Sequence, residues 1–166
     1  DVLRDWVEVG EPESNLEKGE REMIYSIFRF GETLAKDVMV PRIDVLALDI
    51  NTTISEARQE FIKAGHSRVP VYEDTIDNVV GLLYAKDLLS VVDGNDTIAQ
   101  QRRLLRPAYF IPETKKVDEL LTEMQSRGVH MAVVVDEYGG MAGVVTLEDI
   151  MEEIVGEIRD EYDQSE

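Results

Sequence analysis

The feature that most constrains this chain is an internal repeat. Residues 54–73 match residues 117–136 at an offset of 63, and residues 81–88 match residues 143–150 at an offset of 62. The offset changes within a turn, where a one-residue insertion or deletion is tolerated. A unit of roughly 55 residues is too small to bury a core by itself, so we expect two copies that pack together.

Each copy predicts the element order β-α-β-β-α. A short strand precedes an amphipathic helix, which ends at Gly65 in the first copy and at Gly128 in the second. We expect both glycines to be left-handed C-caps and Thr53 to be the N-cap of the first helix. Two strands follow, joined in the second copy by a tight turn at Gly139-Gly140, and then a second helix with Asp87 or Asp149 in its first turn. The predicted strands are 45–48, 69–72 and 79–84, then 109–111, 131–135 and 142–146; the predicted apolar stripes are Ile54, Ala57, Phe61 and Ile62, then Val117, Leu120, Leu121 and Met124.

The composition is acidic and lacks cysteine. The 166 residues include 17 Lys+Arg and 35 Asp+Glu, a net charge of −18, of which −5 lies in residues 1–22 and −8 in residues 148–166. Such a charge argues against nucleic acid or anionic lipid as a partner, and the lack of cysteine excludes disulfides and thiolate zinc sites. No apolar run approaches the roughly 18 residues that span a bilayer. The acidic flanks serve either solubility or an interaction with a partner or a cation.

Several motifs together carry a resemblance to a known family. Read in order, they are Met39-Val40-Pro41-Arg42, Ser67-Arg68-Val69-Pro70-Val71-Tyr72, residues 81–89, Val135-Asp136-Glu137-Tyr138-Gly139-Gly140, residues 145–150 and residues 153–158. This set resembles the tandem CBS-domain pair, or Bateman module, of the CorC/HlyC/CNNM family, which is implicated in magnesium and cobalt export. The resemblance covers about residues 20–158.

The resemblance implies a mixed α/β (α+β) fold, in which two CBS repeats form one pseudo-two-fold module behind an N-terminal helix. We assign 1–35 to a linker and an amphipathic helix at 20–31, 36–104 to CBS repeat 1, 105–158 to CBS repeat 2 and 159–166 to an acidic tail. In this family the module lies in the cytosol, attached to a membrane transport domain. We therefore expect a fragment of a membrane-anchored protein that forms a homodimer through its helices.

The candidate site centres on the last helix of each repeat. Thr146 stands three residues before Asp149, and in CBS pairs this pattern resembles the ribose-phosphate motif of adenosine-nucleotide sites. A carboxylate in the first helical turn is favoured by the helix dipole and can accept hydrogen bonds from a ribose diol. The alternative is that Thr146 and Asp149 only cap the helix. The first repeat has Tyr84 in place of the threonine before Asp87, so we expect the better site at Thr146 and Asp149.

The resemblance assigns further contacts to other segments. The base pocket takes Pro41, Arg42, Asp44, Val45, Leu46 and His66, and the phosphates contact His130 and Met131, with Arg68 at the matching place in the first repeat. Arg42, Arg68, Lys86 and Arg106 form a local basic patch, which either attracts an anionic ligand or pairs with nearby acids. Two histidines without convergent carboxylates argue against a metal centre.

These observations favour binding over catalysis. We expect a regulatory module that binds ATP, with or without Mg²⁺, or AMP, and that gates an attached magnesium or cobalt efflux domain through a ligand-dependent rearrangement. No group is placed as a base for ATP hydrolysis, so an enzyme is not expected. The alternative is a ligand-free dimerisation scaffold with vestigial nucleotide sites.

Overall fold

A computed structural model describes residues 32–165, with side chains described as far as Gly156. The predicted linker 1–19 and the predicted helix 20–31 lie outside the described residues. The chain divides into two compact units. We call them the sheet unit, which comprises Met39–Glu113 and Met131–Val145, and the helix unit, which among the described residues comprises 32–38, Thr114–His130 and 146–165.

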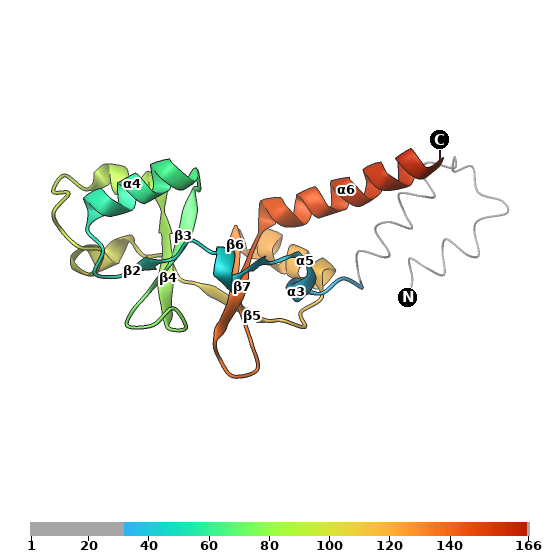
Figure 1. Ribbon diagram of the computed structural model, residues 1–166, viewed down its shortest axis with the longest axis horizontal. Coiled ribbons are helices and arrows are strands. Elements are labelled where there is room, and N and C mark those ends of the chain that lie inside the picture. Colours follow the sequence, from blue (N-terminus) through green and yellow to red (C-terminus); the bar gives the residue numbers. More distant parts are fainter. Residues whose placement is uncertain (1–31, 166) are drawn as a thin grey trace. The chain divides into compact units, whose positions relative to one another are not determined.

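The sheet unit contains two small sheets, each built mainly from one repeat (Figure 1). The three-stranded sheet has the order β2 (Leu48–Asp49), β3 (Arg68–Tyr72), β4 (Val79–Tyr84), and α4 (Ile54–Ala64) belongs to the same repeat. The four-stranded sheet has the order β1 (Val40–Pro41), β7 (Met141–Thr146), β6 (Met131–Val135), β5 (Tyr109–Pro112). Short 3₁₀ helices complete the unit: η2 (Arg42–Asp44), η3 (Ala85–Ser90) and η4 (Ala99–Leu104).

Strand pairing reproduces the sequence repeat. β2 runs parallel to β3 with Leu48 opposite Val71, and β5 runs parallel to β6 with Ile111 opposite Val134. Both members of the second pair stand 63 residues after their counterparts in the first. The two predicted repeats and the mixed α+β fold are therefore confirmed.

Each repeat also lends its leading segment to the other repeat. β1 pairs antiparallel with β7, with Val40 opposite Val144, while Arg106 bridges to Leu82 of β4 through backbone hydrogen bonds of 2.8 and 2.9 Å. This reciprocal exchange is what a pseudo-two-fold relation between the repeats requires. The leading segment differs from the prediction, because only Leu48 of the predicted strand 45–48 lies in β2.

Local signals place α4 as predicted. The Thr53 hydroxyl accepts a hydrogen bond from the Glu56 N–H at 3.2 Å, which makes Thr53 the N-cap, and Gly65 ends the helix with a φ of 73°. Ile54, Ala57 and Phe61 are buried. The expectation for Ile62 was wrong: its side chain is 83% exposed, because it lies beyond the edge of the buried stripe.

Apolar contact between the two sheets holds the sheet unit together. One cluster combines residues of β4, β6 and β7, namely Val79, Leu82, Met131, Val133, Met141 and Val144. A second cluster lies within the first repeat and joins α4 to β2, β3 and β4. Neither repeat therefore buries its strands alone, as the size argument predicted.

The helix unit contains α3 (Ala35–Val38), α5 (Val117–Arg127) and α6 (Leu147–Ser165), and both α3 and α5 contact α6. Gly128 ends α5 with a φ of 67°. The backbone of α6 stays helical through most of the predicted tail 159–166. No helix in the described part of the chain is long and apolar enough to span a membrane.

Candidate functional site

Thr146 and Asp149 lie at the start of α6 in the helix unit. The Asp149 backbone N–H donates to the Thr146 hydroxyl at 3.1 Å, so the threonine caps the helix. Both side chains are half-buried, and the Asp149 carboxylate makes no hydrogen bond or ion pair to any described residue. The predicted capping role is thus present, and the carboxylate itself remains available to a ligand.

Asp87, the counterpart of Asp149 in the first repeat, has a different environment. Arg106 donates to both of its carboxylate oxygens, from Nε at 3.0 Å and from Nη2 at 3.1 Å. This side-chain hydrogen bonding raises the pKa of Arg106 above its ordinary value. A bidentate pair of this kind uses the two oxygens that a ribose diol would need. Asp87 also stands in the 3₁₀ helix η3, where the sequence predicted the start of an α-helix; Tyr84 offers no side-chain cap there.

Cationic side chains surround the Tyr84 ring. The guanidinium carbon of Arg106 lies 4.1 Å from the ring centroid, that of Arg68 lies 5.2 Å away, and the Lys86 ammonium lies 5.8 Å away. Such contacts are attractive because the face of an aromatic ring carries negative potential. Three members of the predicted basic patch, two from the first repeat and Arg106 from the second, therefore lie near the Tyr84 ring, and Arg106 also pairs with Asp87.

The strand register explains why Asp87 has an arginine partner and Asp149 does not. Arg106 pairs with Leu82, and Val40 pairs with Val144, the residue 62 positions after Leu82. Val40 is thus the register counterpart of Arg106, and its side chain has no hydrogen-bond donor. The sequence placed Arg106 in the basic patch but gave no sign of this partner, because the contact depends on strand pairing between the repeats.

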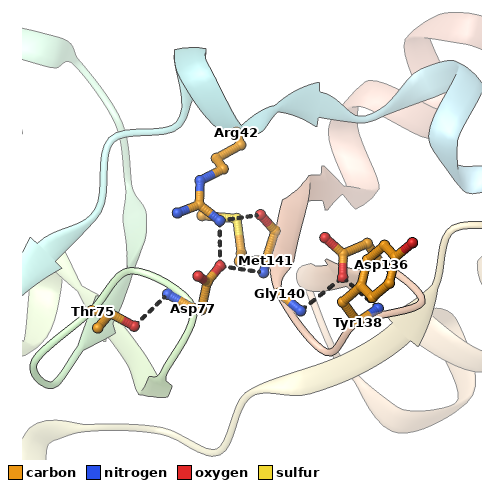
Figure 2. A network of polar contacts seen from close by, with 7 residues as sticks. All are labelled: Arg42, Thr75, Asp77, Asp136, Tyr138, Gly140 and Met141. Carbon is orange, nitrogen blue, oxygen red and sulfur yellow. Dashed lines mark hydrogen bonds and ion pairs between the residues drawn. The ribbon is translucent and has the colours of Figure 1, made fainter.

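Arg42, predicted for the base pocket, is part of a polar network in the sheet unit (Figure 2). Its Nη1 is paired with the Asp77 carboxylate and donates to the Met141 carbonyl at 3.2 Å. Asp77 also accepts the Met141 backbone N–H at 2.9 Å. Hydrogen bonds from Arg42 and from Met141 hold the pKa of Asp77 below its ordinary value. The sequence did not predict Asp77 as a member of this network, because the residues next to a loop aspartate do not show which distant side chain it will contact.

The other predicted site residues divide between the two units. His130 belongs to the helix unit, where its side chain is exposed and its carbonyl accepts the Leu147 N–H at 2.9 Å. In the sheet unit, Asp44 and His66 are exposed, while Val45 and Leu46 are half-buried against the apolar clusters. The Met131 side chain is 5% exposed within the cluster of Val79 and Leu82, which leaves only its backbone for a ligand.

Two curated relatives are similar to this chain over nearly all of it. A UPF0053 protein of Mycobacterium tuberculosis is 44% identical across 99% of this chain and 38% of its own length. The magnesium and cobalt efflux protein CorC of Pasteurella multocida is 39% identical across 100% of this chain and 54% of its own length. The chain thus spans about half, or less, of these relatives.

Solved structures of CBS domains are similar to this chain over nearly all of their own length. The CBS domain of a bacterial CNNM/CorC family Mg²⁺ transporter has a TM-score of 0.80 and 40% identity, and covers 93% of this chain and 94% of its own. The same kind of domain in complex with ATP has a TM-score of 0.77 and 44% identity, over 82% and 97%. A CBS-domain pair from Klebsiella pneumoniae with bound AMP has a TM-score of 0.63 and 31% identity, over 75% and 99%.

The family to which the chain belongs agrees with these similarities. The CBS domain family matches two segments, residues 35–94 and 102–156, which correspond to the two repeats. Together with the strand register and the similar structures, this match shows that the chain belongs to the CBS-domain family and is a tandem CBS pair of the CNNM/CorC type.

Proposed function

We propose that this CBS pair binds an adenosine nucleotide, ATP or AMP, with Asp149 contacting the ribose and Thr146, at the N-terminus of α6, contacting phosphate. The observation that carries the proposal is the unequal state of two equivalent aspartates: Asp87 already holds Arg106 in a bidentate pair, whereas Asp149 has no partner among the described residues. The similar CBS domains that were solved with ATP and with AMP support this ligand class.

Regulation of transport is the wider role that we propose. The chain covers only part of its curated relatives, and those named CorC are magnesium and cobalt efflux proteins. We place this module on the cytoplasmic side of such a protein, attached to its membrane domain. A nucleotide that binds one arrangement of the module more tightly than another shifts the balance between them, and this shift would gate the attached domain.

Magnesium enters this proposal as the counterion of ATP. The chain carries a net charge of −18, so a bare triphosphate approaches against long-range repulsion. Bound Mg²⁺ neutralises part of the triphosphate charge. We therefore expect ATP to bind more tightly with Mg²⁺ than without it, and AMP to respond little.

Calorimetric titration of the chain with ATP, ADP, AMP and S-adenosylmethionine tests the proposal. Wild-type protein should bind ATP or AMP, Asp149→Ala should abolish that binding, and the matched variant Asp87→Ala should leave it nearly unchanged. Thermal unfolding of both variants checks that they fold. If no nucleotide binds the wild type, the dimerisation scaffold becomes the better account; if Asp87→Ala abolishes binding instead, the wrong repeat has been assigned.

A further inference from the structure

A groove of about 360 Å³ lies beside α4 in the sheet unit. It is lined by residues of segment 46–49, which ends in β2, by residues of α4, and by Thr52 and Tyr72. We call it the α4 groove. No lysine, arginine or histidine is among the described residues that line it. The charged lining residues are three carboxylates, Asp49, Glu56 and Glu60.

The three carboxylates differ in how far they are already occupied. Asp49 accepts a hydrogen bond at 2.8 Å from a backbone N–H two residues further on, and Glu56 accepts one at 3.1 Å from the N-cap hydroxyl of α4. Glu60 is half-buried and makes no hydrogen bond or ion pair to any described residue. Lys63, about one turn further along α4, is exposed and does not pair with it. The α4 groove therefore contains a half-buried carboxylate that has no cation among the described residues.

The second repeat supplies such a cation from its own chain. Lys115 stands 63 residues after Thr52, and both lie two residues before the first residue of a helix, α4 or α5. Glu123 stands 63 residues after Glu60. The Lys115 ammonium donates to the Glu123 carboxylate at 2.6 Å, and the two side chains are only 22% and 33% exposed. At equivalent positions, one repeat thus has a lysine–glutamate pair, and the other has a threonine and an unpaired glutamate.

We propose that the α4 groove binds a primary alkylammonium group supplied by a ligand, which takes the part that Lys115 plays in the second repeat. The ammonium pairs with Glu60, and the half-buried Leu46 and Ala47 offer apolar surface to its methylene chain. The ring of Tyr72, which also lines the α4 groove, can contact the cation by its face. Linear polyamines and lysine side chains of a partner both carry this group.

An elongated ammonium ion fits the α4 groove better than a metal ion does. No three potential metal-ligating side chains of the described residues lie close enough together to hold a metal, so Asp49, Glu56 and Glu60 are spread along the α4 groove. Its volume is at the lower end of that of small-molecule sites, which suits a slender chain. The inference does not depend on the proposed nucleotide site, which is assigned to Asp149 in the helix unit.

Calorimetric titration with spermidine at physiological salt tests the proposal. We expect one spermidine per chain, and Glu60→Gln should weaken it about fivefold through the loss of one ion pair. Glu137→Gln is the matched control, because it removes the same charge from an exposed residue outside the α4 groove. Equal weakening by both variants would show that spermidine responds to the net charge of −18 and would overturn the proposal. Displacement of spermidine by MgCl₂ beyond the effect of NaCl at equal ionic strength would do the same.

A trilysine peptide with both ends blocked distinguishes the two sources of the ammonium group. Tighter binding of spermidine points to a free polyamine, and tighter binding of the peptide points to a lysine of a partner protein. Either result supports the proposal if Glu60→Gln weakens the preferred ligand and Glu137→Gln does not. If neither spermidine nor the peptide binds the wild-type chain, the proposal fails, whatever the chain does with nucleotides.

Thr52→Lys gives the first repeat the lysine that the second repeat has. Its ammonium should pair with Glu60 and so weaken spermidine at least tenfold. Urea denaturation should show a small gain in stability that disappears when Glu60→Gln is added. Ala64→Lys is the control, since it adds the same charge at the exposed end of α4. Spermidine affinity that is unchanged in Thr52→Lys, or that falls equally in Ala64→Lys, would show that the α4 groove is not the site.

Discussion

Asp87 and Asp149 occupy the same place in two copies of one sequence pattern and differ in their partners. The Asp87 carboxylate pairs with Arg106, and the Asp149 carboxylate has no hydrogen-bond or ion-pair partner among the described residues. A carboxylate that already has a bidentate partner must give up those hydrogen bonds before it can bind a ligand, and hydrogen bonds to charged groups are among the stronger ones. We therefore expect the partner residue to decide which repeat is open to a nucleotide.

Replacing Arg106 by alanine should reveal what this pairing contributes to stability. The variant loses the ion pair with Asp87 and the contact with the Tyr84 ring. Because the two charged side chains are 41% and 24% exposed, solvent screens the pair, and we expect only a small loss in the free energy of unfolding. Urea denaturation should show that this difference shrinks at high salt. Arg103→Ala, at an exposed arginine of the same segment, is the control; an equal loss there would contradict the prediction.

Asp77 should make stability depend on acidic pH. Its pKa in the folded protein is lowered, first by the hydrogen bond from Arg42 and then by that from Met141. The contribution is therefore complete above the ordinary aspartate pKa of about 3.9 and is lost as the pH falls through the lower folded value. The difference in unfolding free energy between wild type and Asp77→Asn should be constant near neutral pH and shrink in acid. A difference that does not change down to strongly acidic pH would contradict the ion pair.

At the scale of elements, the pairing of β1 with β7 depends on a glycine. A Cβ at Gly143 would overlap the Val40 carbonyl and come within 2.9 Å of the Met39 sulfur. We expect Gly143→Ala to destabilise the protein by about 1–3 kcal/mol, as overpacking does, measured by urea denaturation. Gly156→Ala is the control, because nothing lies near its Cβ and alanine favours a helix. Similar stability of the two variants would show that β1 can shift away from β7 at little cost.

The elements that could be predicted are those specified by neighbouring residues. The apolar spacing of α4 and the glycines that end α4 and α5 are local signals, and the structure bears them out. β1 was not predicted, because two residues become a strand only through a partner more than a hundred positions away. The same holds for the site: Thr146 and Asp149 lie within one local motif, whereas the partners of Arg42 and Arg106 depend on how the repeats pair.

At the scale of the whole molecule, the acidic charge and the apolar surface act in opposite directions on association. A net charge of −18 opposes contact between copies, yet several large apolar side chains of the sheet unit are exposed, including Ile62 at 83%, Leu89 at 86% and Val92 at 98%. Arg58 of α4 donates to the Leu88 carbonyl at 2.9 Å, and Ile62 lies one turn further along that helix. We call Ile62, Leu89 and Val92 the apolar patch.

We expect the apolar patch to contribute to the homodimer that the family resemblance implies, since large exposed apolar side chains can mark association sites. Leu89→Glu and Val92→Lys should each raise the dimer dissociation constant about tenfold or more, because each loses apolar contact area and places a charge in the interface. Light scattering coupled to gel filtration, run over a range of protein concentrations, measures this change. Tyr138→Glu is the control, because Tyr138 is exposed in the turn between β6 and β7, away from these elements in sequence. If the wild-type chain is a monomer, the expected dimer of this chain is excluded. If only Tyr138→Glu loses the dimer, the interface lies at the turn between β6 and β7 instead.

Salt provides an independent check. Because screening reduces the repulsion between two acidic copies, a dimer held by the apolar patch should become tighter, not weaker, as ionic strength rises.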